Sequence, residues 1–188
     1  MSRRVILVLS GLAVLAAVMV GIAQLTGGED ATLHPLGTEV VVGYQEPKDD
    51  GSSGERTQFG LTIVAVRRGT QEELEANGIE VEPEDRTATP YYVDARFTNR
   101  GPSAVERAPS VGLEDSDGNT FRSLIVFGGG VEPFEPCPEA SGGGLEPGGS
   151  GESCSLILVP DGLDVAKVYY LSDHGPDKEP EWVYWAPE

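Results

Sequence analysis

The sequence predicts an all-β protein: an antiparallel β-sandwich of about seven to nine strands, preceded by a single N-terminal transmembrane helix. Short apolar and β-branched runs are separated by turn residues, and the 188 residues include 25 glycines and 14 prolines. Residues 91–98 alternate between apolar and polar side chains, which is the period of a strand with one buried face. Outside residues 5–23, no segment with a helical period is longer than two turns. These observations favour two packed layers of strands.

The N-terminal segment is predicted to be a membrane anchor. Residues 5–23 form an uncharged run of 19 residues directly after Arg3 and Arg4. As a helix this run spans roughly 28 Å, close to the hydrocarbon thickness of a bilayer. Arginines before the run and an acidic chain after it predict a cytoplasmic N-terminus and an extracellular C-terminal domain. We therefore expect residues 1–24 to be a single-pass signal anchor whose partner is the cytoplasmic membrane.

The alternative for this segment is a cleaved secretion signal. Gly21-Ile22-Ala23 has the small-x-small pattern that signal peptidases use. Cleavage near Ala23 would release a secreted domain.

Charge separates the two parts of the chain and excludes one class of partner. The chain has 13 basic and 31 acidic residues, a formal net charge of −18. Residues 25–188 hold 11 of the basic residues and all 31 acidic ones, a net charge of −20. Such an acidic surface repels phosphate backbones, so we expect no nucleic-acid partner. This part suits one domain, with residues 25–37 as a stalk and 38–188 as the sandwich.

The strands of the sandwich are separated by residues that favour turns. Asn99-Arg100-Gly101 ends one strand, and Asp115 to Asn119 form a hairpin turn in which Gly118 tolerates a positive φ. Residues 46–57 are an expected loop. The expected strands cover residues 38–44, 59–68, 91–98, 111–113, 121–127, 154–159, 165–171 and 182–185.

Residues 69–89 interrupt the strands with an acidic segment that contains Gly78 and Pro83. Residues 71–76 have the composition for one or two helical turns. Since the segment holds few apolar residues to pack, we expect a surface insertion.

The apolar positions of the strands predict the core of the sandwich. In residues 91–98 one face is apolar and the other polar, so the apolar face is expected inside. The expected core residues are Val41, Leu61, Ile63, Val64, Val66, Val93, Ala95, Phe97, Leu113, Phe121, Leu156, Leu158 and Val168.

The order of motifs resembles a known family. The motifs are Gly60–Val66, Tyr92–Gly101, Leu113–Phe121, Leu145–Gly148 and an apolar strand that closes on Pro160. Over about residues 38–171 this order resembles the immunoglobulin-like extracytoplasmic domains of unknown function in surface lipoproteins and membrane-anchored proteins of Gram-positive bacteria. The resemblance implies an immunoglobulin-like sandwich outside the cytoplasm and supplies no catalytic residue. The lipid-attachment cysteine is missing, so anchoring falls to residues 5–23.

The two cysteines are expected to form a disulfide. Cys137 and Cys154 lie 17 positions apart around a glycine-rich segment, and an isolated pair in an exported domain is most simply bonded. Closing this loop is worth roughly 3 kcal/mol in the chain-entropy model. A catalytic thiol is less favoured, because no histidine lies nearby in the sequence.

Metal sites are only weakly indicated, and we expect no cofactor. His34 and His174 are the two histidines, too few for a zinc site. Asp115, Asp117 and Asn119 space oxygen side chains as calcium loops do, but the position of the bidentate glutamate is occupied by Val126. A hairpin turn is therefore the favoured interpretation, with calcium as a weak alternative.

No catalytic constellation emerges from the motifs. Residues 148–152 read Gly-Gly-Ser-Gly-Glu, which lacks the final glycine of a nucleophile elbow and precedes a strand instead of a helix. Neighbouring carboxylates such as Glu72 and Glu73 are expected on the surface of so acidic a chain. We therefore expect that the protein is not an enzyme.

The C-terminal aromatics are the best candidates for a contact site. Trp182, Tyr184 and Trp185, with Tyr169 and Tyr170, form the densest aromatic group, either as core or as a platform for a sugar or peptide. The two tryptophans must lie on opposite faces of a strand, because their numbers differ by three. Whichever tryptophan is exposed is the expected partner contact, together with loops around residues 141–151.

These observations predict a membrane-anchored interaction module of the cell envelope without catalytic activity. Its expected partner is an unknown extracytoplasmic protein, peptide or envelope polymer, bound through loops held on rigid strands. A cleaved, secreted structural or spacer domain is the alternative. A hydrolase with an unrecognised site is less favoured.

Overall fold

The computed structural model describes residues 32–47, 53–127, 134–137, 144–173 and 179–187. These residues belong to one compact unit, Ala31–Glu188. The predicted membrane helix and the first part of the predicted stalk lie outside the described ranges. Within those ranges, no helix is long and apolar enough to cross a membrane.

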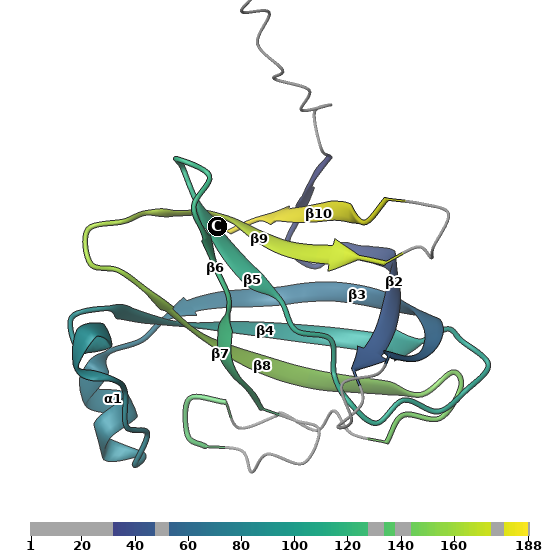
Figure 1. The fold of residues 1–188 in the computed structure, drawn as a ribbon, viewed down its shortest axis with the longest axis horizontal. Coiled ribbons are helices and arrows are strands. Elements are labelled where there is room, and N and C mark those ends of the chain that lie inside the picture. Colours follow the sequence, from purple (N-terminus) through teal and green to yellow (C-terminus); the bar gives the residue numbers. More distant parts are fainter. Residues whose placement is uncertain (1–31, 48–52, 128–133, 138–143, 174–178, 188) are drawn as a thin grey trace, which may run out of the picture. The chain divides into compact units, whose positions relative to one another are not determined.

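The described chain folds into two facing sheets of five strands each (Figure 1). The elements are β1 (Leu33–Pro35), β2 (Glu39–Pro47), β3 (Ser53–Arg68), α1 (Gln71–Ala76), the 3-10 helix η1 (Pro83–Asp85), β4 (Thr89–Asn99), β5 (Gly112–Asp115), β6 (Thr120–Phe121), β7 (Ser123–Phe127), β8 (Ser150–Val159), β9 (Val165–Ser172) and β10 (Glu181–Ala186). The first sheet has the strand order β1-β10-β9-β5-β6, and the second has β2-β3-β4-β8-β7. All neighbouring strands are antiparallel except β1 and β10, which run parallel.

The predicted all-β sandwich is confirmed, with ten strands in place of the expected seven to nine. β1 lies in the predicted stalk. It has three residues, too few to show a period in the sequence, and it pairs with β10. Residues 46–57, an expected loop, contain the paired ends of β2 and β3, with Gln45 opposite Arg56. In both places backbone pairing with a partner strand defines the strand. The sequence there shows no alternation of polar and apolar residues.

The main core lies between the two sheets and agrees largely with the expectation. Phe59 of β3 and Phe97 of β4 meet edge to face with ring centroids 5.5 Å apart. Trp185 of β10, one of the aromatics expected either in the core or on a platform, and Tyr44 of β2 are also buried here. The expected core residues that lie between the sheets are Leu61, Ile63, Val93, Ala95, Phe97, Leu113 and Val168.

Two expected core residues are wrong, because Val41 and Val64 are exposed. Val41 is the middle residue of three valines, and both of its neighbours face inward. A run of identical residues does not show which of them face the core. Val64 is the extra residue of a bulge in β3, which turns its side chain outward. Val66 and Phe121 are partly buried against the main core, and Leu158 is partly buried against a second cluster.

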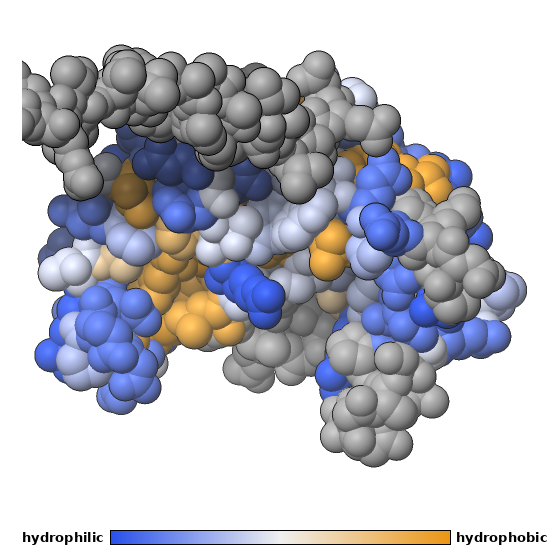
Figure 2. Space-filling model, turned by 45° about the horizontal axis from the view of Figure 1, so that its top comes forward, coloured by the Kyte–Doolittle hydropathy of each residue, from blue (hydrophilic) through white to orange (hydrophobic). Residues whose placement is uncertain are grey.

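Helix α1 corrects the prediction that residues 69–89 do not pack. Leu74 is fully buried. Thr70 and Glu73 form a capping box at the start of the helix, in which each side chain accepts from the backbone N–H of the other residue. Figure 2 shows a hydrophilic surface on α1 and hydrophobic residues beside it. Leu74, together with the partly buried Ile79 and Val81 that follow the helix, packs this acidic segment against the second sheet.

A second hydrophobic cluster covers the outer face of β4 and β8. The predicted disulfide between Cys137 and Cys154 is confirmed and ties residues 134–137 to β8. Its two cysteines are themselves buried in the cluster. The buried members are Leu74, Tyr92, Cys137, Cys154 and Leu156. β4 and β8 are thus covered on both faces, which explains why β8 is apolar on both sides.

Asn99 fixes the turn that follows β4. This side chain is fully buried, and its Oδ1 accepts from the backbone N–H of Gly101 at 2.9 Å. Its Nδ2 donates to the carbonyl of Ser103 at 2.8 Å and to that of Leu145 at 3.0 Å. Gly101 must lack a side chain, since a Cβ there would lie 1.6 Å from Thr57 Oγ1.

We predict that Phe97→Ala lowers the free energy of unfolding by about 3–5 kcal/mol, because it removes a buried ring and leaves a cavity. Chemical denaturation followed by tryptophan fluorescence measures the change. Val64→Ala is the control on the neighbouring strand, with an expected loss within about 0.5 kcal/mol because that side chain is exposed. A loss below about 1 kcal/mol for Phe97→Ala would show that the inward face of β4 is misassigned.

Candidate functional site

A row of large side chains occupies the outer face of the first sheet. Val183 and Trp185 of β10 point into the core, so the alternation of the strand turns Trp182 and Tyr184 outward. In the pairing of β10 with β9, Trp182 lies opposite Leu171 and Tyr184 lies opposite Tyr169. Leu33 of β1 lies beside Tyr184. We call this surface the aromatic face; its residues are Leu33, Tyr169, Leu171, Trp182 and Tyr184.

Trp182 is the centre of the aromatic face. Its ring meets Tyr169 edge to face at 5.1 Å and lies nearly parallel to Tyr184, at 13° and 6.4 Å. Trp182 is 43% exposed, Leu171 46% and Leu33 49%. The tryptophan ring is thus held by aromatic neighbours on two sides and still open to solvent, as in anchor residues of protein interfaces.

Gly112 of β5 makes room for the aromatic face. Gly112 pairs with Tyr169 across β5 and β9. A Cβ at Gly112 would lie 2.3 Å from Cζ of Tyr169 and 2.5 Å from its hydroxyl oxygen. The tyrosine ring therefore lies directly over this backbone, and any side chain at Gly112 would displace the ring that supports Trp182.

The side chain of Lys167 lies over the ring of Tyr184, the neighbour of Trp182. The Nζ atom of Lys167 lies 4.8 Å from the ring centroid of Tyr184. The same Nζ donates to Oε1 of Glu114 at 2.7 Å, and this hydrogen bond raises the pKa of Lys167. Glu114 is buried. A charge-assisted contact thus fixes a cation against an aromatic side chain of the site.

The structure separates the predicted contact residues. Trp182 and Tyr184 share the outer face, whereas Trp185 is fully buried and its Nε1 donates to the carbonyl of Thr38 at 3.1 Å. The predicted opposite orientation of the two tryptophans is confirmed, and Trp185 is corrected from a candidate contact to a core residue. Gly112, Lys167, Glu114, Leu171 and Leu33 were not predicted for this site, although Leu171 lies two positions after Tyr169 in an expected strand and therefore on the same face.

The second predicted contact region, residues 141–151, is described only from residue 144 onward. Leu145 is buried and exchanges two backbone hydrogen bonds with Val105. Gly148 has a positive φ of 79°, which its turn requires. The described part of this segment is thus bound to the sandwich, and its participation in recognition stays a prediction.

The weak calcium site has the geometry of a hairpin turn. Oδ1 of Asp115 accepts from the backbone N–H groups of Asp117 and Asn119, both at 2.9 Å. Its Oδ2 accepts from Nδ2 of Asn119 at 2.7 Å. Both carboxylate oxygens of Asp115 are therefore directed at the turn itself, as the favoured interpretation predicted. Within the described residues, no three histidine, cysteine or acidic side chains group as metal ligands do; His174 lies outside those residues.

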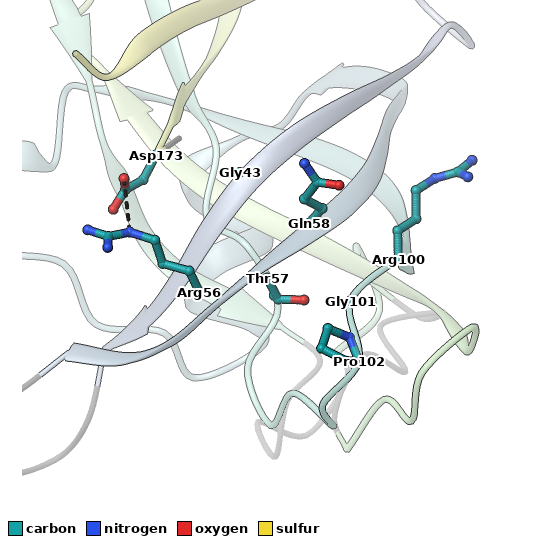
Figure 3. Close-up of a pocket in the computed structure, with 8 residues that line it drawn as sticks. All are labelled: Gly43, Arg56, Thr57, Gln58, Arg100, Gly101, Pro102 and Asp173. Carbon is teal, nitrogen blue, oxygen red and sulfur yellow. Dashed lines mark ion pairs between the residues drawn. The ribbon is translucent and has the colours of Figure 1, made fainter. Parts of the chain in front are cut away.

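A cavity of about 350 Å³, lined by residues of β2, β3 and the turn after β4, does not form a converging site (Figure 3). Arg56 extends toward Asp173, with Nε and Oδ1 3.5 Å apart. Arg100 extends to the opposite side, where it pairs with Glu39. The two guanidinium groups therefore diverge, and each is engaged with its own carboxylate.

Comparisons with known proteins find a similarity to a solved structure at low sequence identity. No family model matches the chain, and no curated protein matches its sequence. The chain is similar to MPT63, a secreted protein from Mycobacterium tuberculosis, with 17% sequence identity and a TM-score of 0.45. The similarity covers 84% of this chain and 98% of that one. The resemblance to surface domains of Gram-positive bacteria stays a prediction.

We predict that the turn at Asp115 makes stability depend on pH. The hydrogen bond from Asn119 lowers the pKa of Asp115 in the folded protein. A carboxyl group whose folded pKa is lowered stabilises the fold above its unfolded pKa of about 4, and this contribution is lost as pH falls through the folded value. Asp115→Asn should therefore destabilise the protein at pH 7, and the difference from wild type should shrink below about pH 4.

Denaturant unfolding of both proteins between pH 7 and pH 2.5 measures this difference. Asp117→Asn is the matched control, since the Asp117 side chain is exposed and contributes only its backbone N–H to the turn. A difference between wild type and Asp115→Asn that is constant with pH would contradict the prediction.

Proposed function

We propose that this chain is an extracytoplasmic recognition domain, anchored by residues 5–23, that binds a basic segment of another protein on its aromatic face without catalytic turnover. The observation that carries this proposal is the exposed ring of Trp182, which Tyr169 and Tyr184 hold in place. Exposed apolar residues that are contiguous on a surface, unlike ones that are scattered singly, mark interaction sites. The immunoglobulin-like type of sandwich, whose rigid strands commonly carry recognition surfaces, is part of the proposal.

The chemistry of the aromatic face favours a cationic partner. Lys167 shows that a cation is accommodated against Tyr184. Tryptophan binds cations more strongly than tyrosine does, and no lysine or arginine is paired with the ring of Trp182 among the described ring contacts. A lysine or arginine of a partner would therefore find an aromatic ring without a described cation, opposite the exposed Leu171.

The charge of the domain supports the same class of partner. Residues 25–188 carry a net charge of −20. A negative surface of this size raises the rate at which basic partners meet it, and the effect weakens as salt screens the charges. Apolar contacts at Trp182, Leu171 and Leu33 would then supply affinity that salt affects less. An envelope glycan, which carries no positive charge to be steered, is the alternative that the experiment must separate.

We predict that Trp182→Ala weakens binding of an oligoarginine peptide to the full-length chain in a neutral detergent by about tenfold, because an anchoring ring is lost. Calorimetric titration measures the affinity, and added salt should lower it. Leu124→Ala is the matched control, since Leu124 is an exposed residue of β7 in the other sheet.

Three outcomes would contradict the proposed partner. The first is equal binding of oligoarginine by wild type and Trp182→Ala. The second is equal binding of oligoglutamate, which would show that charge does not select the partner. The third is tighter, salt-independent binding of a neutral oligosaccharide, which would favour an envelope glycan.

We predict that the full-length chain stays in membranes after a carbonate wash, because residues 5–23 are long and apolar enough to span a bilayer. Fractionation of cells followed by mass spectrometry of the N-terminus measures this. A chain that begins near Gln24 in the culture medium would instead show a secreted domain. A peripheral protein without an apolar segment serves as the control that the wash removes.

A further inference from the structure

One ring of the aromatic face is already in contact with a cation, which the chain itself supplies. Nζ of Lys167 lies 4.8 Å from the ring centroid of Tyr184 and donates to Oε1 of Glu114 at 2.7 Å. Glu114 is buried, so a carboxylate shielded from water holds the ammonium group in this position. A partner's cation would have to displace Lys167 to reach Tyr184. Trp182, the exposed ring of the face, is therefore the ring that is open to a partner.

The surroundings of Trp182 differ from those of Tyr184. Trp182 lies opposite Leu171 in the pairing of β10 with β9, and Leu171 is exposed beside it. Its described ring contacts are with Tyr169 and Tyr184. A cation at Trp182 would thus lie among apolar and aromatic side chains, and it would bind through the face of the indole ring.

These surroundings favour a guanidinium group over an ammonium group. An ammonium group is compact and strongly hydrated, and the one on Tyr184 has Glu114 as an acceptor in place of water. A guanidinium group is planar and weakly hydrated, and it stacks on aromatic rings. Trp182 is 43% exposed, so a guanidinium group stacked on the indole would keep the N–H groups at its edge in water. Arginine therefore loses less hydration than lysine at this ring.

The tyrosine hydroxyls of the aromatic face are engaged within the face. The Tyr184 hydroxyl forms a hydrogen bond with Glu114, and the Tyr169 hydroxyl forms hydrogen bonds with Thr120 and Arg122. Burial raises the pKa of both tyrosines, so both hydroxyls stay uncharged at neutral pH. The tyrosines therefore offer a partner their rings rather than their hydroxyls, which suits stacking better than the hydrogen bonding that a glycan needs.

We propose that the aromatic face selects an arginine side chain of its partner, stacked on Trp182, and that Lys167 determines this specificity. Lys167 closes Tyr184 and the carboxylate of Glu114 to a partner's lysine, and the ring that stays open is the one that suits a guanidinium group. This inference rests on the proposed function, because it specifies which basic residue the aromatic face binds.

The first test compares hexapeptides of arginine, lysine and citrulline by calorimetric titration of the full-length chain in a neutral detergent. Hexaarginine and hexalysine carry the same charge, so the acidic domain attracts both, whereas hexacitrulline resembles hexaarginine in shape and is uncharged. We expect hexaarginine to bind about tenfold more tightly than either of the others. In Trp182→Ala the preference over hexalysine should fall below about twofold. Leu124→Ala, a change of an exposed residue in the other sheet, should retain it.

The second test opens the ring that Lys167 occupies. In Lys167→Met a partner's ammonium group can take the place beside Glu114 and Tyr184, so hexalysine should bind about tenfold more tightly than it binds wild type. Lys167→Arg keeps a cation at Tyr184 and is the matched control, with an unchanged affinity for hexalysine. Lys167→Met combined with Glu114→Gln leaves no buried charge behind and opens the Tyr184 ring alone, so this variant should bind hexaarginine more tightly than wild type does. Thermal unfolding checks the fold of each variant.

Four outcomes would contradict the inference. Equal binding of hexaarginine and hexalysine by wild type, with both weakened in Trp182→Ala, would overturn the arginine specificity and leave recognition of basic partners at Trp182 intact. A preference for hexaarginine that persists in Trp182→Ala would place the specificity elsewhere. Wild-type affinities for both peptides in Lys167→Met and in the double variant would overturn the role of Lys167. Unchanged hexaarginine binding in Trp182→Ala would overturn the proposed function together with this inference.

Discussion

The passage of the chain from the second sheet to the first depends on one buried amide, Asn99. Its side chain holds the turn that leaves β4, and its backbone accepts from Gly148 and donates to Gly149, each at 2.8 Å. One residue therefore aligns the exit from β4 with the entry into β8, while the chain that leaves the turn continues to β5. That strand carries Gly112 and Glu114, on which Tyr169 and Lys167 depend. The strand that supports the aromatic face is thus reached through a hydrogen-bonded turn at the other sheet.

The sequence predicts the fold where polar and apolar residues alternate and fails where they do not. In β4 the alternation was clear, and Val93, Ala95 and Phe97 are buried as expected. The valine run around Val41 has no polar residue to mark the outer face, and the bulge at Val64 changes the face in the middle of an apolar strand. Local composition does not show which face Val41 or Val64 takes, because pairing with a strand distant in the sequence decides the register.

The candidate site was predicted only as far as parity allows. An odd spacing placed Trp182 and Trp185 on opposite faces, but which one is exposed depends on the position of β10 over the core. Lys167 and Glu114 come together through the pairing of β9 with β5, which no local pattern encodes. The second cluster is similar: Leu74 is one apolar residue in an acidic segment, and its burial depends on Tyr92 and on the segment that the disulfide fixes.

Two of the described ion pairs hold a cation against an aromatic ring. Glu114 holds Lys167 over Tyr184, so a partner's cation would contact Trp182 without having to displace Lys167. Arg67 is held by Asp94 through Nε and Nη2, with its guanidinium over the ring of Tyr92. In both places an acidic residue fixes the position of a cation against an aromatic ring. Removing Glu114 or Asp94 would therefore release the cation from that ring.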